Sequence, residues 1–149
     1  MKVFKDTEGR EWLLSINVAA VKRVRSLIDV DLMGIIEGTL LEKLVSDPVM
    51  LCDVVYCLVK PDADEKGVSD EEFGKAMGGD VLEHATQALL EELADFFPKK
   101  KRALLRKALV KLKALEEKAL AVAEKRLDGS ELENEMAAVL GTGGSSSGS

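Results

Sequence analysis

The sequence contains few of the side chains that catalyse reactions or bind transition metals. His84 is the only histidine, which excludes histidine pairs and multi-histidine metal sites. Cys52 and Cys57 lie five residues apart in an apolar stretch, so on a helix they would point about 140° apart and act as small buried hydrophobes. The sequence also lacks the phosphate-binding glycine loops and the H-E-x-x-H zinc motif. The pattern G-x-S-x-G occurs only within the Ser-rich tail at 144–148, which offers no scaffold to hold a nucleophile. We therefore expect no enzyme, with no catalytic, cofactor-binding or metal-ligating residues.

One acidic segment partly matches a calcium-binding loop. Residues 62–67, Asp-Ala-Asp-Glu-Lys-Gly, place Asp, Asp and Gly at positions one, three and six of such a loop. Lys66 then puts a cation at position five, and Phe73 occupies position twelve, where a bidentate Glu is required. We expect instead a polar loop over 61–67, followed by a capping box that joins Ser69 to Glu72.

A basic run, Lys99-Lys100-Lys101-Arg102, directly follows Pro98. It could bind phosphate or an acidic partner, or it could be the solvated first turn of a helix. Cations at a helix N-terminus oppose the helix dipole, so the run is electrostatically unfavourable in that position. The sequence leaves both interpretations open.

Length and charge limit the classes of partner. The chain has 149 residues, with 21 Lys and Arg against 27 Asp and Glu, for a net charge of -6. A chain of this length is expected to bury a single hydrophobic core. The excess of acidic residues disfavours nucleic acid and anionic lipid as main partners. No apolar run approaches the roughly 18 to 20 residues needed to cross a bilayer, and no leader is recognised at residues 1–6. We expect a cytoplasmic protein with no membrane contact.

The first sixteen residues predict a β-hairpin. Apolar and polar residues alternate over 2–5 and again over 11–16, on either side of a turn that contains Gly9. Phe4 and Trp12 fall on one side of this hairpin. Because two strands alone are only marginally stable in water, that side must pack on helices or pair with the edge of another chain.

The rest of the sequence predicts a helical bundle. Caps, apolar spacing and breakers place helices at 18–28, 40–45, 49–59, 70–77, 80–97, 99–127 and 131–140. We expect a mainly α fold, in which the N-terminal β-hairpin is followed by a helical bundle with a long C-terminal helix. Residues 1–98 form the hairpin and helical core, 99–140 the long helix and a short terminal helix that pack on the core or project, and 141–149 a flexible Gly/Ser tail.

The long helix carries more apolar surface than the preceding helix can cover. One stripe repeats at steps of three and four, and a second stripe widens it: Leu105, Ala108, Leu112, Leu115, Ala119 and Val122, then Leu104, Leu109, Leu120, Ala123 and Leu127. Either helices 80–97 and 131–140 pack back on it, or a partner supplies a helix. The candidate partner-binding residues are Phe4, Trp12, Leu89, Leu93, Phe96, Phe97, Leu105, Leu109, Leu112 and Leu115.

Taken in order, several features over residues 1–110 resemble the tail assembly chaperones of long-tailed bacteriophages. They are the hairpin with Phe4 and Trp12, the helix after Asn17, the break at 30–32, the helix start at Asp47-Pro48, Phe73 in the capped helix, and the run from Leu89-Leu90 to Phe96-Phe97-Pro98. The long helix from Lys99 departs from the compact members of that family. No catalytic residues come with the resemblance.

The resemblance implies a protein that is absent from the finished particle and works in the host cytoplasm. It would bind the long, helical tape measure protein and help tail tube subunits polymerise around it. Such families often make a longer product by ribosomal frameshifting, and the Gly/Ser tail from Gly141 suits a joint to such an extension as well as it suits an added expression sequence. The alternatives are a structural or oligomeric scaffold protein and a regulatory adaptor of a mobile element. Weak homo-oligomerisation would also fit a chaperone.

Overall fold

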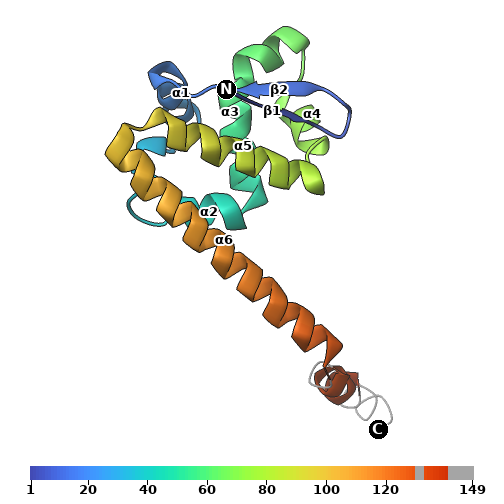
Figure 1. Cartoon of the computed structure of the whole chain (residues 1–149). Helices are drawn as coiled ribbons and strands as arrows, with labels where there is room; N and C mark the ends of the chain where they lie inside the picture. Colours follow the sequence, from blue (N-terminus) through green and yellow to red (C-terminus); the bar gives the residue numbers. More distant parts are fainter. Residues whose placement is uncertain (130–132, 141–149) are drawn as a thin grey trace. The chain divides into compact units, whose positions relative to one another are not determined.

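The computed structural model describes residues 1–129 and 133–140, which divide between two units, Met1–Leu109 and Val110–Ser149 (Figure 1). The expected mainly α fold with an N-terminal hairpin and a long helix is confirmed. The expected Gly/Ser tail at 141–149 lies outside the described residues, as do residues 130–132. The elements are β1 (Lys2–Lys5), β2 (Glu11–Leu14), α1 (Val18–Ile28), the 3₁₀ turn η1 (Leu32–Gly34), α2 (Leu40–Ser46), α3 (Pro48–Lys66), α4 (Asp70–Lys75), α5 (Asp80–Phe96) and α6 (Lys99–Asp128), and residues 133–140 are helical again.

The N-terminal hairpin packs its apolar side on helices of its own chain. Phe4 pairs with Trp12 across the antiparallel strands, and both side chains are buried together with Leu14. β1 lies against α5, and β2 lies against α3. Val3 and Leu13 form the neighbouring pair and point to the other face, where both are exposed. The alternation in the sequence therefore sets which face of the hairpin joins the core.

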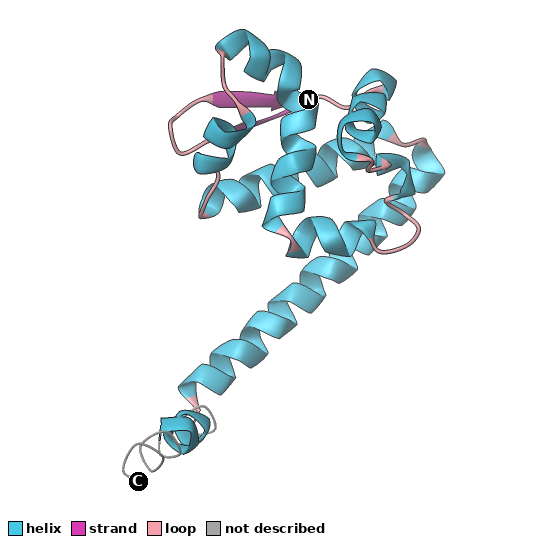
Figure 2. Cartoon of the chain, turned by 180° about the vertical axis from the view of Figure 1, so that it is seen from behind, coloured by secondary structure: helices cyan, strands magenta, loops and turns pink. Residues whose placement is uncertain are grey.

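α3 is the central helix of the first unit, and α1, α2, α4, α5 and β2 all contact it (Figure 2). It starts as the sequence predicts, because the Asp47 carboxylate accepts hydrogen bonds from the N–H groups of Val49 and Met50, and Pro48 occupies the first turn. Its buried side chains cover about two thirds of the helix circumference: Leu51, Val54, Val55, Cys57, Leu58, Val59 and Ala63. A helix with so wide an apolar surface is stable in water only when other elements enclose it.

The expected polar loop at 61–67 is wrong, because α3 continues through Pro61 to Lys66. A proline within a helix has no N–H to donate to the carbonyl four residues earlier, here that of Cys57. Arg23 of α1 supplies the missing donor, with its guanidinium 3.0 Å from the Cys57 carbonyl oxygen and 3.1 Å from that of Leu58. The partner of the carbonyl thus comes from another helix, which local sequence patterns cannot show.

Two further features hold the polar end of α3 in helical form. Lys60 pairs with Asp64 at 2.9 Å, and Lys66 pairs with Asp62 at 3.0 Å, each four residues apart along the helix. Gly67 then ends the helix in the left-handed conformation, with φ of 69°. The segment that resembled a calcium loop is therefore helical.

The other helix starts follow their predicted caps with one exception. The Asn17 side chain accepts a hydrogen bond from the Ala20 N–H, and the Ser69 hydroxyl accepts one from the Glu72 N–H. At the start of α5, Asp80 is a second candidate for the cap from its residue type, but Gly79 is the cap and Asp80 is the first helical residue. The φ of 56° at Gly79 requires a conformation that glycine adopts without strain.

Candidate partner-binding surface

Six of the ten predicted partner-binding residues lie in the hydrophobic core of the first unit. They are Phe4, Trp12, Leu89, Leu93, Phe97 and Leu105, and each exposes 5% of its surface or less. Their side chains contact other parts of the same chain, so a partner does not reach them in this fold. An apolar stripe has the same spacing whether its own chain or a partner covers it, and for this reason the sequence placed them at an interface.

Trp12 is fixed from several sides and acts as a core anchor. Its indole N–H donates to the Asp6 carboxylate at 2.9 Å, and Phe73 meets the ring edge-on with centroids 5.3 Å apart. The Lys66 ammonium lies 4.4 Å from the ring centroid, within cation–π range. Asp6 also accepts hydrogen bonds from the N–H groups of Glu8 and Arg10 and from the Arg10 guanidinium. The Asp6 carboxylate therefore joins the hairpin turn to Trp12.

The other four predicted residues are accessible to different degrees. Phe96 is half-buried and lies edge-on to Phe97, and Leu109 and Leu112 are also half-buried. Leu115 is 63% exposed. These four residues lie at the end of α5 and along α6.

The largest group of exposed apolar side chains lies in the second unit, Val110–Ser149. Its exposed members are Val110, Leu115, Leu120, Val122, Leu127, Met136, Val139 and Leu140. Apart from Leu115, none was among the predicted contacts, although Leu120, Val122 and Leu127 belong to the two stripes that the sequence predicts. In an amphipathic helix, side chains at steps of three and four share one face. We define the α6 seam as Leu112, Leu115, Ala119 and Val122, all within this unit.

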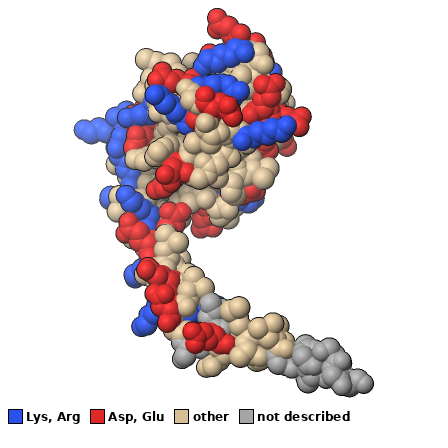
Figure 3. Space-filling model, turned by 90° about the vertical axis from the view of Figure 1, so that its right-hand side faces the viewer, with Lys and Arg blue, Asp and Glu red and all other residues tan. Residues whose placement is uncertain are grey.

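Charged residues follow the edges of the α6 seam. Lys111, Lys118 and Lys125 are exposed and seven residues apart, and none forms an ion pair with a residue that the structure describes. Glu116 borders the opposite edge. Figure 3 shows uncharged side chains beside acidic and basic ones along this part of the chain. Beyond the seam, Arg126 pairs with Glu135 at 2.7 Å.

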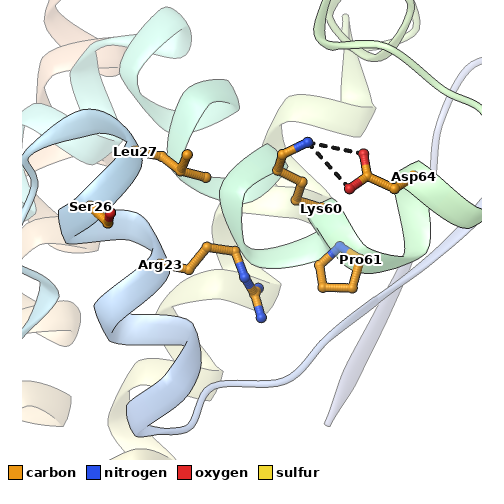
Figure 4. A pocket seen from close by; sticks show the side chains of 6 residues that line it. All are labelled: Arg23, Ser26, Leu27, Lys60, Pro61 and Asp64. Carbon is orange, nitrogen blue, oxygen red and sulfur yellow. Dashed lines mark hydrogen bonds and ion pairs between the residues drawn. The ribbon is translucent and has the colours of Figure 1, made fainter.

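A shallow depression of about 310 Å³ separates α1 from α3 in the first unit (Figure 4). Six residues line it: Arg23, Ser26, Leu27, Lys60, Pro61 and Asp64. Both of its cations already have partners, because Arg23 donates to the α3 carbonyls and Lys60 pairs with Asp64. Neither cation is therefore left to bind a ligand in the depression.

No protein-family model, curated protein or solved structure matches this chain. Its functional assignment therefore depends on the surfaces and side chains described above.

The groups capable of chemistry are dispersed. Cys52 and Cys57 are both free thiols; Cys57 is buried as predicted, whereas Cys52 is only half-buried. Burial, followed by the charge of Asp53, raises the pKa of each. His84 is exposed on α5. The buried Glu92 carboxylate is paired with the ammonium group of Met1. Within residues 1–129 and 133–140, no three His, Cys, Asp or Glu side chains are placed to hold a metal ion, and no helix is both long and apolar enough to span a membrane.

Proposed function

We propose that this protein is a non-enzymatic tail assembly chaperone of a long-tailed bacteriophage, which binds the tape measure protein in the host cytoplasm and assists tail tube assembly. The observation that carries the proposal is the row of exposed side chains along the α6 seam, above all Leu115 and Val122. A tape measure protein is long and helical, and an amphipathic helix can lay its apolar face on such a row.

The exposure of this row supports binding to another protein. Leu115 and Val122 lie seven residues apart on the same face and are 63% and 67% exposed. Large apolar side chains exposed on one face of a helix commonly mark a contact with a partner. The row is interrupted by charged residues, which suits reversible capture better than permanent burial.

The first unit supports the proposal through the order of its elements. The hairpin, the helix capped by Asn17, the helix start at Asp47-Pro48 and the helix that ends at Phe96 all occur in the order on which the resemblance rests. This support concerns architecture alone, and the client is inferred from the family resemblance.

Co-expression with the tape measure protein of the same genome tests the proposal. We expect the full chain to keep the tape measure protein soluble and to co-purify with it. The double variant Leu115→Glu/Val122→Glu should lose both effects. Lys113→Glu is the matched control, because it lowers the net charge by the same two units on the side of α6 away from the seam. If the wild-type chain leaves the tape measure protein insoluble, the proposal fails.

The same apolar row also suits a permanent homo-oligomer, as in a structural scaffold protein. Light scattering on the purified chain separates the two functions. A chaperone should be monomeric or weakly associating, whereas a scaffold should form an oligomer of constant mass over a wide concentration range. An oligomer of constant mass for the wild type, together with a monomer for the Leu115→Glu/Val122→Glu variant, would favour the scaffold.

A further inference from the structure

We infer that the α6 seam docks an amphipathic helix whose flank is acidic. This inference rests on the proposed function and adds the chemistry of the client segment that would be bound. Its evidence is the placement of three lysines beside exposed apolar residues in the second unit.

Helix geometry places the seam and the lysines side by side. At 100° per residue, Leu112, Leu115, Ala119 and Val122 fall within an arc of about 80°. Lys111, Lys118 and Lys125 fall within an arc of about 40° that begins beside Val122. In a pair of packed helices, residues at such positions border the apolar contact and face the flank of the partner helix.

The three lysines of the flank have no counter-ion among the described residues, whereas two arginines on either side of them along α6, Arg106 and Arg126, are paired. Arg106 pairs with Asp95 at 2.8 Å and Arg126 pairs with Glu135 at 2.7 Å. A helix with Asp or Glu at seven-residue spacing would supply an acid to each of them. Such pairs at the edge of an apolar contact select the partner more than they increase affinity.

A second copy of this chain fits the seam less well than an acidic helix. In an antiparallel pair related by two-fold symmetry, the lysine flank of one copy would meet the lysine flank of the other. In a parallel pair the lysine flank would meet the opposite edge, where Glu116 is followed seven residues later by the neutral Ala123. One ion pair per edge would then form, and Lys118 and Lys125 would remain without acids.

The part of α6 that carries the seam favours a protein partner over a lipid surface. Residues 110–128 contain five bases and four acids, in contrast to the basic first turns of the helix. An anionic membrane would therefore attract this part, which carries little net charge, only weakly. α6 also contains no Phe, Tyr or Trp, the side chains that commonly anchor interfacial helices.

The test measures fluorescence anisotropy of labelled synthetic peptides titrated with the full chain. The acidic peptide has four heptads with Leu at a and d and Glu at e and g, and the matched basic peptide has Lys at e and g. Like charges keep each peptide from pairing with itself. We expect the acidic peptide to bind about tenfold more tightly than the basic one, from three exposed ion pairs.

Charge reversal makes the test specific to the seam. The variant Lys111→Glu/Lys118→Glu/Lys125→Glu should reverse the peptide preference, while Lys99→Glu/Lys100→Glu/Lys101→Glu, which changes the net charge equally, should keep it. Circular dichroism verifies that both variants are helical. The inference fails if the wild-type chain binds the two peptides with equal affinity, or if the control variant loses the preference. It also fails if the chain binds vesicles of phosphatidylglycerol and phosphatidylcholine more tightly than it binds the acidic peptide.

The outcomes separate this inference from the proposed function. If wild-type and Lys111→Glu/Lys118→Glu/Lys125→Glu chains keep the tape measure protein soluble equally well, the inference fails and the chaperone function stands. If the chain selects the acidic peptide but does not keep the tape measure protein soluble, the chaperone function fails and the docking of acidic helices stands.

Discussion

The guanidinium of Arg23 lies 3.0 Å from the carbonyl oxygen of Cys57, the oxygen that Pro61 leaves without its helical N–H donor. The same group reaches the Leu58 carbonyl at 3.1 Å. α1 thereby replaces, from outside, a hydrogen bond that α3 lacks. This contact between two helices allows α3 to remain helical through the proline.

Replacing Arg23 should destabilise the first unit. In Arg23→Met the aliphatic stem is largely kept, but the α3 carbonyls lose a charged donor, so we expect the free energy of unfolding to fall by about 1–3 kcal/mol. Urea denaturation followed by circular dichroism measures the change. Arg25→Met is the control, since it removes an exposed ion pair with Asp31 and should cost less than about 1 kcal/mol.

Restoring the backbone donor should make Arg23 less important. In Pro61→Ala the alanine N–H can donate to the Cys57 carbonyl, so Arg23→Met should destabilise this background less than it destabilises the wild type. The comparison is a double-mutant cycle in urea. Equal effects of Arg23→Met in the two backgrounds would show that the arginine does not act through the carbonyl that the proline frees.

Truncation of two leucines on α6 should change the stability by very different amounts. Leu105 is fully buried in the core of the first unit, so Leu105→Ala should lower the free energy of unfolding by about 2–5 kcal/mol. Leu115 is 63% exposed in the second unit, so Leu115→Ala should change the free energy of unfolding by less than about 0.5 kcal/mol. Thermal melts of the isolated chain compare the two. A large loss for Leu115→Ala would mean that its side chain is covered in solution.

Acid should remove the stabilisation that Asp6 provides. Burial raises the pKa of this carboxyl, but hydrogen bonds from Trp12, Arg10 and Glu8 lower it more, so the pKa in the folded protein lies below its ordinary value. The contribution is therefore complete above the unfolded pKa of about 3.9 and is lost as pH falls through the lower folded pKa. We expect Asp6→Asn to cost about 1–3 kcal/mol at neutral pH.

The difference between wild type and Asp6→Asn should shrink in urea titrations below about pH 4. Asp29→Asn serves as the control, because it removes the same charge from an exposed aspartate. A wild-type advantage over Asp6→Asn that stays constant to the lowest pH would contradict a lowered Asp6 pKa.

Calcium should leave the melting temperature unchanged. Asp62 and Asp64 lie on the helical turns at the end of α3, where Lys66 and Lys60 respectively pair with them, so they do not form the loop that surrounds a calcium ion. A ligand that binds only the folded state raises the melting temperature. If calcium raised the melting temperature, a chelator reversed this increase and magnesium did not produce it, the segment would have rearranged into a calcium site.

Local features of the sequence predicted most of the fold. The alternation around Gly9 identified the hairpin, and Asn17, Asp47 and Ser69 marked helix starts that the structure confirms. These signals succeed because each depends on residues within one turn of one another. The prediction at 61–67 failed because the donor for Cys57 comes from Arg23, 34 residues away.

The candidate surface was only partly predictable for the same reason. Leu105 and Leu115 belong to the same apolar stripe, yet Leu105 is enclosed in the first unit and Leu115 is exposed. The sequence by itself determined the elements, their caps and the apolar faces, since these depend on neighbouring residues. Only the tertiary structure decided that α3 passes through Pro61 and which apolar side chains meet solvent, because both depend on what distant segments bring alongside.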